Sequence, residues 1–148
     1  MKTKTIKQGG MFPASPERIY KILMDSKLHS KFTGDVAKIS KKVGGKFSAF
    51  SGYITGKNLV LQPGKKIVQA WRGSEWPKGH MSEVTYLLKP AKSPKGHLGE
   101  SAFGGKGGTK LMFTHKGVPA NDYKDKVKGW KKYYWEPLKK MLEKSRKA

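Results

Sequence analysis

The C-terminal stretch, residues 118–148, decides the fold and reads VPANDYKDKVKGWKKYYWEPLKKMLEKSRKA. Its apolar side chains recur at steps of three, four or one, which is the spacing of one stripe along an α-helix. These positions are Tyr123, Val127, Trp130, Tyr134, Leu138, Met141 and Leu142. Most positions between them are lysine, so the sequence predicts one long amphipathic helix with a buried face and a solvated face.

Two prolines bear on the course of this helix. Pro119 suits its first turn, because the N–H that proline lacks has no partner there. Pro137 instead removes a hydrogen bond inside the helix. We therefore expect a bend near Tyr133, or an end and a restart of the helix at that point.

The N-terminal part predicts one strand and two short helices. Residues 2–12 contain a weakly alternating strand. The sequence Ser15-Pro16-Glu17, with a cap, a first-turn proline and an acidic side chain, opens a helix that should end near Asp25. Residues 26–32 read as a second short helix, capped by Ser26.

From residue 34 to residue 90 the apolar period changes to two, which is typical of strands. Turn signals separate these strands at Gly44-Gly45, Gly56-Lys57-Asn58, Pro63-Gly64 and Trp76-Pro77-Lys78-Gly79. Runs of strand without intervening helices favour an antiparallel meander. Residues 109–115 are the last predicted strand.

Residues 91–108 are rich in glycine and lysine, and we expect a mobile loop there. Residues 104–109 contain glycines, a lysine and a threonine, which are residue types of a phosphate-binding loop. They lack the order of a P-loop, and a strand rather than a helix follows them, so a flexible connection is favoured.

Together these elements predict an α+β fold in a single domain, residues 1–148. A curved antiparallel sheet of six to seven strands should wrap on the long C-terminal helix, with two short helices after strand 1. Only the last helix is long enough to cover such a sheet. We expect an elongated apolar space between the two.

The chain carries a formal net charge of +22 and has no cysteine. This charge attracts polyanions, including nucleic acid and acidic protein surfaces. However, only three of the 32 basic residues are arginine, the side chain that grips phosphates and base edges bidentately. A lysine-rich proteome explains the dispersed lysines equally well. With neither a signal peptide nor an apolar run long enough to span a membrane, we expect a cytoplasmic protein.

The titratable residues do not predict an enzyme, and we expect no catalytic residue, no metal and no cofactor. The four histidines are isolated, and none has metal-ligand spacing. Glu75 and Glu83 flank His80, but they should lie on separate solvated edges. His115, at the end of the last predicted strand, should make a structural hydrogen bond to the backbone.

We expect several aromatic side chains to face the space under the long helix. The candidate lining residues are Trp71, Trp76, Tyr86, Phe113, Trp130, Tyr134 and Leu138. They form either a packed core or a pocket for a small apolar ligand.

The lysine face of the helix is the second candidate site. Its members are Lys131, Lys132, Lys139 and Lys140, with Tyr133 and Trp135 expected to be partly exposed because they lie off the apolar stripe. This face is either simply solvated, or it binds an acidic partner surface through steering that salt weakens. Exposed aromatic side chains among lysines also suit stacking on single-stranded nucleic acid, without sequence preference.

Several stretches resemble one family, and they follow each other in its order along nearly the whole chain. The quoted stretches are FPASPERIY (12–20), GKF (45–47), GYITG (52–56), LQPGKKIVQAWR (61–72), HMSEV (80–84), TKL (109–111), HKGVP (115–119) and GW (129–130). They resemble the START-like, birch-pollen-allergen-like superfamily, also called SRPBCC or helix-grip. The branch is similar to the C-terminal domain of the activator of the 90-kDa heat-shock chaperone ATPase.

This resemblance implies a helix-grip fold and a non-enzymatic binding module. In the eukaryotic activators the corresponding domain is the second of two, and it helps to bring the chaperone's N-terminal domains together. The resemblance therefore implies a chaperone as the partner, and the lysine face of the helix favours an acidic docking surface on it. A small apolar ligand in the cavity is the alternative, and non-specific binding of nucleic acid is a second alternative.

Overall fold

The strands that follow the two short helices form an antiparallel meander, as predicted. The computed structural model describes residues 2–91 and 108–147, and within them a seven-stranded sheet has the order β1-β7-β6-β5-β4-β3-β2. Its strands are β1 (Thr3–Phe12), β2 (Lys38–Ile39), β3 (Lys46–Ala49), β4 (Ile54–Gln62), β5 (Lys66–Gly73), β6 (Ser82–Ala91) and β7 (Gly108–Pro119). Strand β1 pairs with β7, so β1 and β2 lie at the two edges.

Two short helices follow β1, as predicted: α1 (Pro16–Met24) and α2 (Ser26–Thr33). The hydroxyl of Ser15 caps α1 by accepting a hydrogen bond from the Arg18 N–H at 3.2 Å. The prediction of Ser26 as the cap of α2 is wrong. Asp25 accepts from the Leu28 N–H at 3.0 Å, and this leaves the Ser26 hydroxyl to accept from the Ile39 N–H at 2.8 Å.

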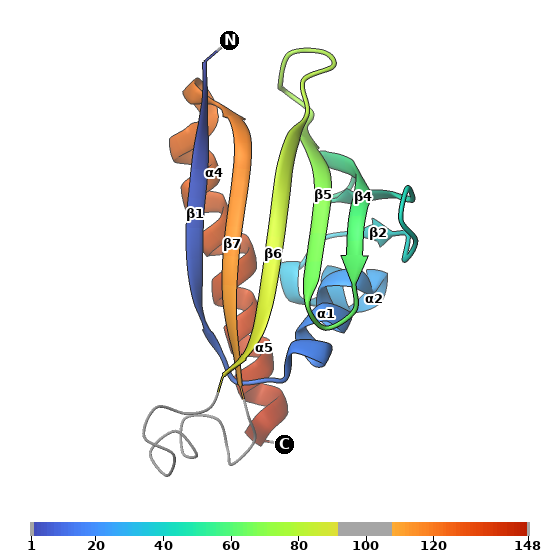
Figure 1. Cartoon of the computed structure of the whole chain (residues 1–148), viewed down its shortest axis with the longest axis vertical. Helices are drawn as coiled ribbons and strands as arrows, with labels where there is room; N and C mark the ends of the chain where they lie inside the picture. Colours follow the sequence, from blue (N-terminus) through green and yellow to red (C-terminus); the bar gives the residue numbers. More distant parts are fainter. Residues whose placement is uncertain (1, 92–107, 148) are drawn as a thin grey trace.

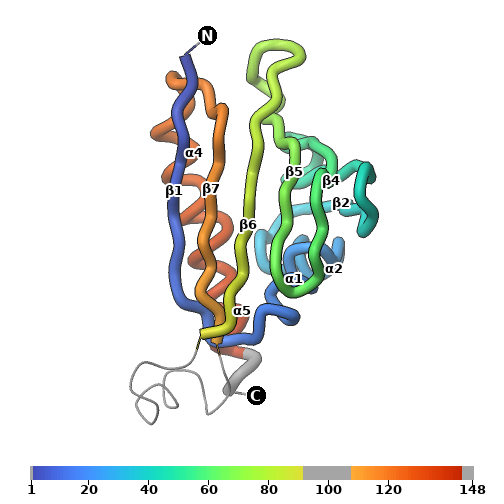
Figure 2. Tube along the Cα trace, in the orientation of Figure 1, coloured from blue at the N-terminus to red at the C-terminus, as the bar shows by residue number. Residues whose placement is uncertain are grey.

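The C-terminal helix runs behind β1 and β7 (Figure 1), and Figure 2 shows these segments side by side along the molecule. It consists of η1 (Ala120–Asp122), α4 (Tyr123–Trp130), η2 (Lys131–Trp135) and α5 (Glu136–Lys147). Pro119 ends strand β7 and does not lie in the first helical turn, so that prediction is wrong. The predicted irregularity near Tyr133 takes the form of the π-helical turn η2, in which the Glu136 N–H bonds the Lys131 carbonyl.

The turn predicted at Gly56-Lys57-Asn58 is wrong, because these residues lie inside β4. Glycine is needed at position 56 for close approach rather than for a turn. A Cβ there would lie 1.9 Å from the Ala70 carbonyl oxygen and 2.5 Å from the Phe47 ring. The glycine that the sequence pattern predicted to be a turn residue is therefore one that lets the two neighbouring strands approach closely.

The core fills the space between the inner face of the sheet and the helices. Large buried contributors are Ile6, Phe12, Ile19, Ile22, Ile67, Trp71, Val84, Tyr86, Leu111, Phe113, Trp130, Leu138 and Leu142. The architecture is therefore the expected α+β helix-grip arrangement. The mobile loop expected at residues 91–108, which the sequence favours over a phosphate cradle, lies outside the described residues except at its ends. No helix in the described part of the chain is long and apolar enough to cross a membrane.

Candidate functional site

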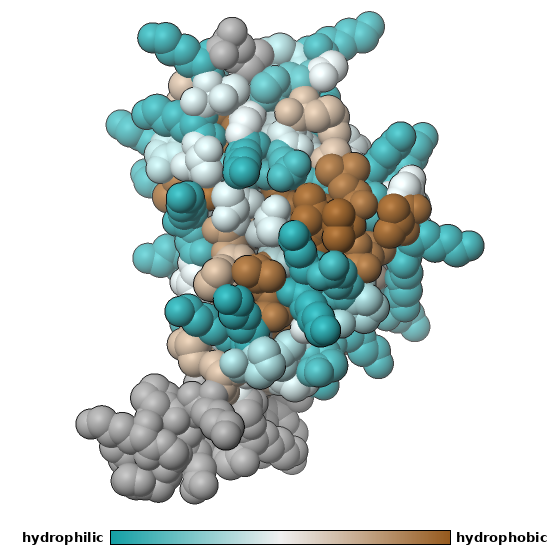
Figure 3. All heavy atoms as spheres, in the orientation of Figure 1, coloured by the Kyte–Doolittle hydropathy of each residue, from teal (hydrophilic) through white to brown (hydrophobic). Residues whose placement is uncertain are grey.

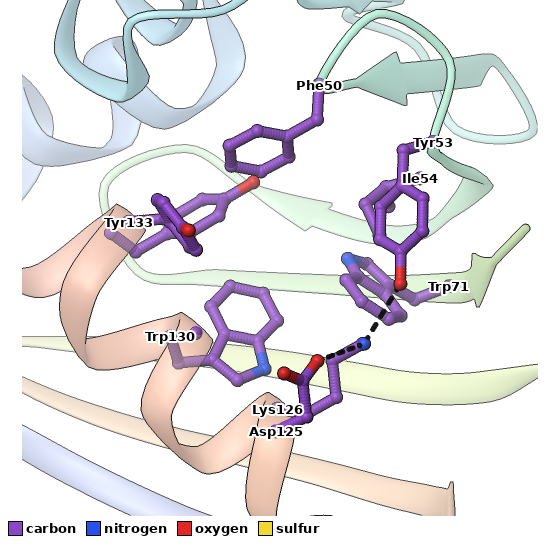
Figure 4. Close-up of a pocket in the computed structure, with 10 residues that line it drawn as sticks. Phe50, Tyr53, Ile54, Trp71, Asp125, Lys126, Trp130 and Tyr133 are labelled. Atoms are coloured by element: carbon purple, nitrogen blue, oxygen red, sulfur yellow. Dashed lines mark hydrogen bonds and ion pairs between the residues drawn. The ribbon is translucent and has the colours of Figure 1, made fainter. Parts of the chain in front are cut away.

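A pocket of about 280 Å³ opens between the sheet and the C-terminal helix (Figure 4). Its lining residues are Phe50, Tyr53, Ile54 and Trp71 from the sheet side, and Asp125, Lys126, Gly129, Trp130, Tyr133 and Tyr134 from the helix. Six of these ten residues are aromatic. The pocket is therefore an aromatic chamber with ionic groups at one end.

The sheet-side rim of the pocket is a turn in an unusual backbone conformation. Phe50 and Ser51 have φ values of 52° and 56°, in the left-handed region that non-glycine residues seldom occupy. This conformation places the Phe50 ring over the helix, with its centroid 5.8 Å from that of Tyr133 and 5.9 Å from that of Tyr134. Figure 4 shows Phe50 and Tyr133 on the same side of the pocket, where their rings meet edge to face at 67°. Backbone strain of this kind concentrates at functional sites.

The helix-side rim of the pocket is the π-helical turn. An extra residue per turn brings positions five apart onto nearly the same side of the helix. As a result the rings of Trp130 and Trp135 stack, with centroids 5.8 Å apart and planes at 18°. Trp135 is only 9% exposed, and its indole N–H donates to the Gln8 amide oxygen at 2.5 Å. The expectation that Trp135 is partly exposed is therefore wrong, because it assumed α-helical spacing.

A buried hydrogen-bond chain supports the floor of the pocket. The Trp130 indole N–H donates to His115 Nδ1 at 3.1 Å, and His115 Nε2 lies 2.7 Å from the Ser82 hydroxyl. Burial lowers the pKa of His115 to about 3, with a further contribution from the charge on Lys126. His115 lies in the middle of β7, not at its end, and it bonds side chains. The expected backbone hydrogen bond is therefore wrong.

A second buried histidine anchors Tyr134. His29 Nε2 lies 2.9 Å from the Tyr134 hydroxyl, and its Nδ1 lies 3.0 Å from the Leu23 carbonyl. Burial lowers the pKa of His29 to about 4. Both histidines are therefore neutral parts of the core at neutral pH.

An ionic cluster surrounds the buried ammonium of Lys126 at the mouth of the pocket. Its Nζ lies 2.7 Å from Asp122, 3.2 Å from Asp125 and 3.6 Å from Glu75. Burial alone would lower the pKa of Lys126, but the hydrogen bond to Asp122 and those to Tyr53 and Asp125 outweigh burial and raise it. The mouth carries three carboxylates against one ammonium, so it is locally negative although the whole chain is positive.

Tyr53 and Trp76 complete this cluster. The Tyr53 hydroxyl donates to Glu75 and accepts from Lys126 at 3.1 Å, and burial followed by the bond to Glu75 raises the pKa of Tyr53 to about 12. The Trp76 indole N–H donates to Asp122 at 2.7 Å. Sequence reasoning missed the cluster because its carboxylates come from two segments about 50 residues apart, and only the fold joins them.

The residues predicted to line a ligand pocket occupy different places. Trp71, Trp130 and Tyr134 line the chamber. Tyr86 reaches a nearly filled void of about 10 Å³ beside His29. Trp76, Phe113 and Leu138 are buried in the core.

The residues of the predicted partner surface lie beside two different hollows along the C-terminal helix. The side chains of Lys131, Lys132, Tyr133, Lys139 and Lys140 are exposed. Lys131 and Lys139 border a hollow beside β1, and Lys140 borders a groove between α5 and α2. The lysine face therefore comprises two neighbouring basic borders rather than one flat patch.

Comparison with known proteins places this chain in a family. A family model described as "Activator of Hsp90 ATPase homolog 1-like protein" matches residues 13–96. The chain belongs to this family. Over 128 residues it is 30% identical to the human protein named activator of 90 kDa heat shock protein ATPase homolog 1, and over 137 residues it is 31% identical to the Dictyostelium discoideum homologue.

These alignments cover 86% and 93% of this chain, but only 34% and 32% of the two relatives. This member of the activator family therefore spans about a third of the length of the curated relatives that it matches. Among solved structures, an HSP90 activator from Plasmodium falciparum superposes with a TM-score of 0.78 at 24% identity, covering 93% of this chain and 95% of that one. That likeness confirms the fold.

Proposed function

We propose that this chain is a chaperone-binding module that docks, without catalysing a reaction itself, onto an acidic surface of a 90-kDa heat-shock protein. The observation that carries the proposal is membership of the activator family, in which matching relatives are named for their action on the ATPase of that chaperone. The lysine face of the C-terminal helix is the proposed contact. Its exposed lysines suit an acidic partner by charge.

Charge reversal at this face tests the proposal. We expect the replacement of Lys131, Lys132, Lys139 and Lys140 by Glu to weaken binding to the purified chaperone at least tenfold at low salt, because steering and contact charges both reverse. Surface plasmon resonance at low and high salt measures the change. The effect should shrink at high salt, where the Debye length is short.

The matched control replaces four exposed lysines elsewhere, Lys21, Lys27, Lys38 and Lys42, by Glu. It changes the net charge by the same amount and should affect binding far less. Equal losses in both variants would show that only overall charge matters. Unchanged binding in the helix variant would refute docking through this face.

A second candidate function rests on the aromatic chamber. Its volume of about 280 Å³ and its six aromatic rings suit a small, flat, apolar molecule. The carboxylates of Glu75, Asp122 and Asp125 at the mouth disfavour an anionic ligand. We infer that any such ligand is uncharged or carries a positive group.

Filling the chamber from the helix tests this candidate. A Cβ added at Gly129 would meet the Tyr133 ring at 3.9 Å, an ordinary contact, so Gly129→Leu fits the helix and directs its side chain at the chamber. We expect the neutral dye N-phenylnaphthylamine to bind the unmodified protein and to bind Gly129→Leu at least tenfold more weakly, as followed by dye fluorescence. Lys128→Leu, one residue away and exposed, should bind as the unmodified protein does.

Native mass spectrometry after a high-salt wash provides the complementary measurement. A reproducible extra mass that disappears in Gly129→Leu would identify a retained ligand. Dye binding that survives in Gly129→Leu would contradict the assignment of the chamber as the site.

A further inference from the structure

The outer face of the sheet, away from the helices, carries apolar side chains where the fold requires none. In β5, β6 and β7 the inward positions Ile67, Tyr86 and Phe113 belong to the core. Side chains alternate along a strand, so Val68, Leu87 and Met112 point outward. Figure 3, which views this face, shows a hydrophobic area over β4 and β5 and a smaller one over β6, with hydrophilic atoms between and around them.

Strand register makes these side chains neighbours on the outer face of the sheet. Val60 of β4 lies opposite Val68 of β5, and Leu87 of β6 lies opposite Met112 of β7. Val68 and Leu87 are diagonal neighbours, because Val68 is opposite Thr85.

The register shift between Asn58 and Val60 adds Leu59 at the same end. Leu59 is 44% exposed, Val60 and Met112 are each 36% exposed, and Val68 between them is only 8% exposed. We name Leu59, Val60, Val68, Leu87 and Met112 the outer patch.

Lysines surround the outer patch on the same face. The outward positions at its margins are Lys7, Lys57, Lys66, Lys89, Lys110 and Lys116, and the register pairs Lys89 with Lys110 and Lys66 with Leu87. Glu83, which lies opposite Lys116, is an acidic residue on this outer face. An apolar centre with a rim of one charge sign is the anatomy of a docking surface.

We propose that the outer patch docks an acidic protein surface that presents apolar side chains at its centre. The inference rests on the proposed function, and it assigns the occupant to the same chaperone. The lysine face of the helix then steers the encounter, whereas the outer patch supplies the desolvated contact that slows dissociation.

Charge and side-chain type decide between the possible occupants. A second copy of this chain would bring two lysine rims of the same sign together, at a net charge of +22 on each copy. Single-stranded nucleic acid requires aromatic side chains for stacking, and the paired outward positions around the patch carry aliphatic ones. Arg72, which is outward by register, is engaged with the carbonyls of Trp76, Pro77 and His80.

An anionic bilayer is negatively charged, as the proposed acidic protein surface is, so the experiment below also tests for binding to a bilayer. Interfacial membrane anchors typically use aromatic side chains. All four tryptophans of this chain are instead buried on the inner side. This favours a protein over a bilayer.

The test compares two double variants in binding to the purified 90-kDa chaperone. Val60→Thr with Met112→Thr removes apolar surface from the outer patch and keeps residues that favour strands. Val36→Thr with Met81→Thr removes similarly exposed apolar surface outside the patch, since these two side chains are 53% and 44% exposed. Thermal unfolding confirms that both double variants are folded.

We expect the outer-patch variant to bind at least tenfold more weakly, chiefly through faster dissociation, and the matched control to bind as the unmodified protein does. Chaperone binding that is equal in the two variants would overturn this inference and leave the proposed function standing. A loss in the outer-patch variant without a loss in the helix charge-reversal variant would instead refute docking through the helix. If the unmodified protein does not bind the chaperone, both proposals fall.

Co-sedimentation with phosphatidylserine vesicles measures whether the outer patch binds an anionic bilayer instead. We expect no difference in vesicle binding between the outer-patch variant and its control. Vesicle binding that the outer-patch variant alone loses, with chaperone binding intact, would assign the patch to a membrane and overturn the proposal.

Discussion

Acidification from about pH 7.5 to about pH 5 is expected to lower the free energy of unfolding by about 4 kcal/mol, through two buried histidines. The folded-state pKa is about 4 for His29 and about 3 for His115, and burial is the main cause of both shifts. In the unfolded chain both return to about 6.5. Below about pH 6.5 the two histidines bind protons in the unfolded state but stay neutral in the folded state. The free energy of unfolding therefore falls as the pH is lowered from about 6.5.

Urea unfolding at a series of pH values measures this loss. His29→Gln and His115→Gln should each remove about half of the pH dependence, and the double variant should remove nearly all of it. Where a variant is too unstable, the ring signals of the unmodified protein in NMR provide the same information, because neither histidine should titrate above about pH 5. Stability that is flat between pH 7.5 and pH 5 would contradict the prediction.

Replacement of Trp130 by Ala is expected to cost about 3–5 kcal/mol and to lower Tm by roughly 10 °C. Trp130 is 3% exposed. The centroid of its ring lies 4.4 Å from that of Phe113 and 4.5 Å from that of Tyr134. The substitution leaves a large cavity and also removes the N–H donor of His115.

Two further variants separate the contributions of packing and hydrogen bonding. Trp130→Phe keeps a ring but loses the donor, so it should cost less than the Ala substitution. Tyr133→Ala, in the same helix but 47% exposed, should cost less than about 1 kcal/mol. Calorimetric unfolding compares all three, and a loss below about 1 kcal/mol for Trp130→Ala would refute the assigned role.

The local signals of the sequence predicted most of the fold because they coincide with tertiary structure. Ser15-Pro16-Glu17 opens α1 as expected, and the period of two in residues 34–90 does form antiparallel strands. Gly56 misled because glycine has two uses, as a turn residue and as a point of close approach. Only the positions of Phe47 and Ala70 decide between these uses.

The candidate site was less predictable because it depends on geometry that no periodicity reveals. Assigning Trp135 to the exposed face assumed a uniform α-helix, and the π-helical turn at Lys131–Trp135 rotates that side chain into the core. Lys126 reads as one more surface lysine in a run of lysines. Its burial follows from carboxylates that the fold brings to it from β5–β6 and from the start of the helix.

The free edge of β1 bears on how the chain behaves among copies of itself. Among the described strands, β1 has a neighbour on one side only, and an edge strand of ten residues is a template for further strands, and hence for aggregation. Here Lys4 and Lys7 lie in the edge strand and Lys2 directly precedes it, and the Lys4 ammonium lies 5.1 Å from the centre of the Tyr123 ring of the C-terminal helix. Two such edges that approach in antiparallel fashion would set lysines beside lysines. The charge that attracts acidic partners thereby also discourages growth of the sheet into a fibril.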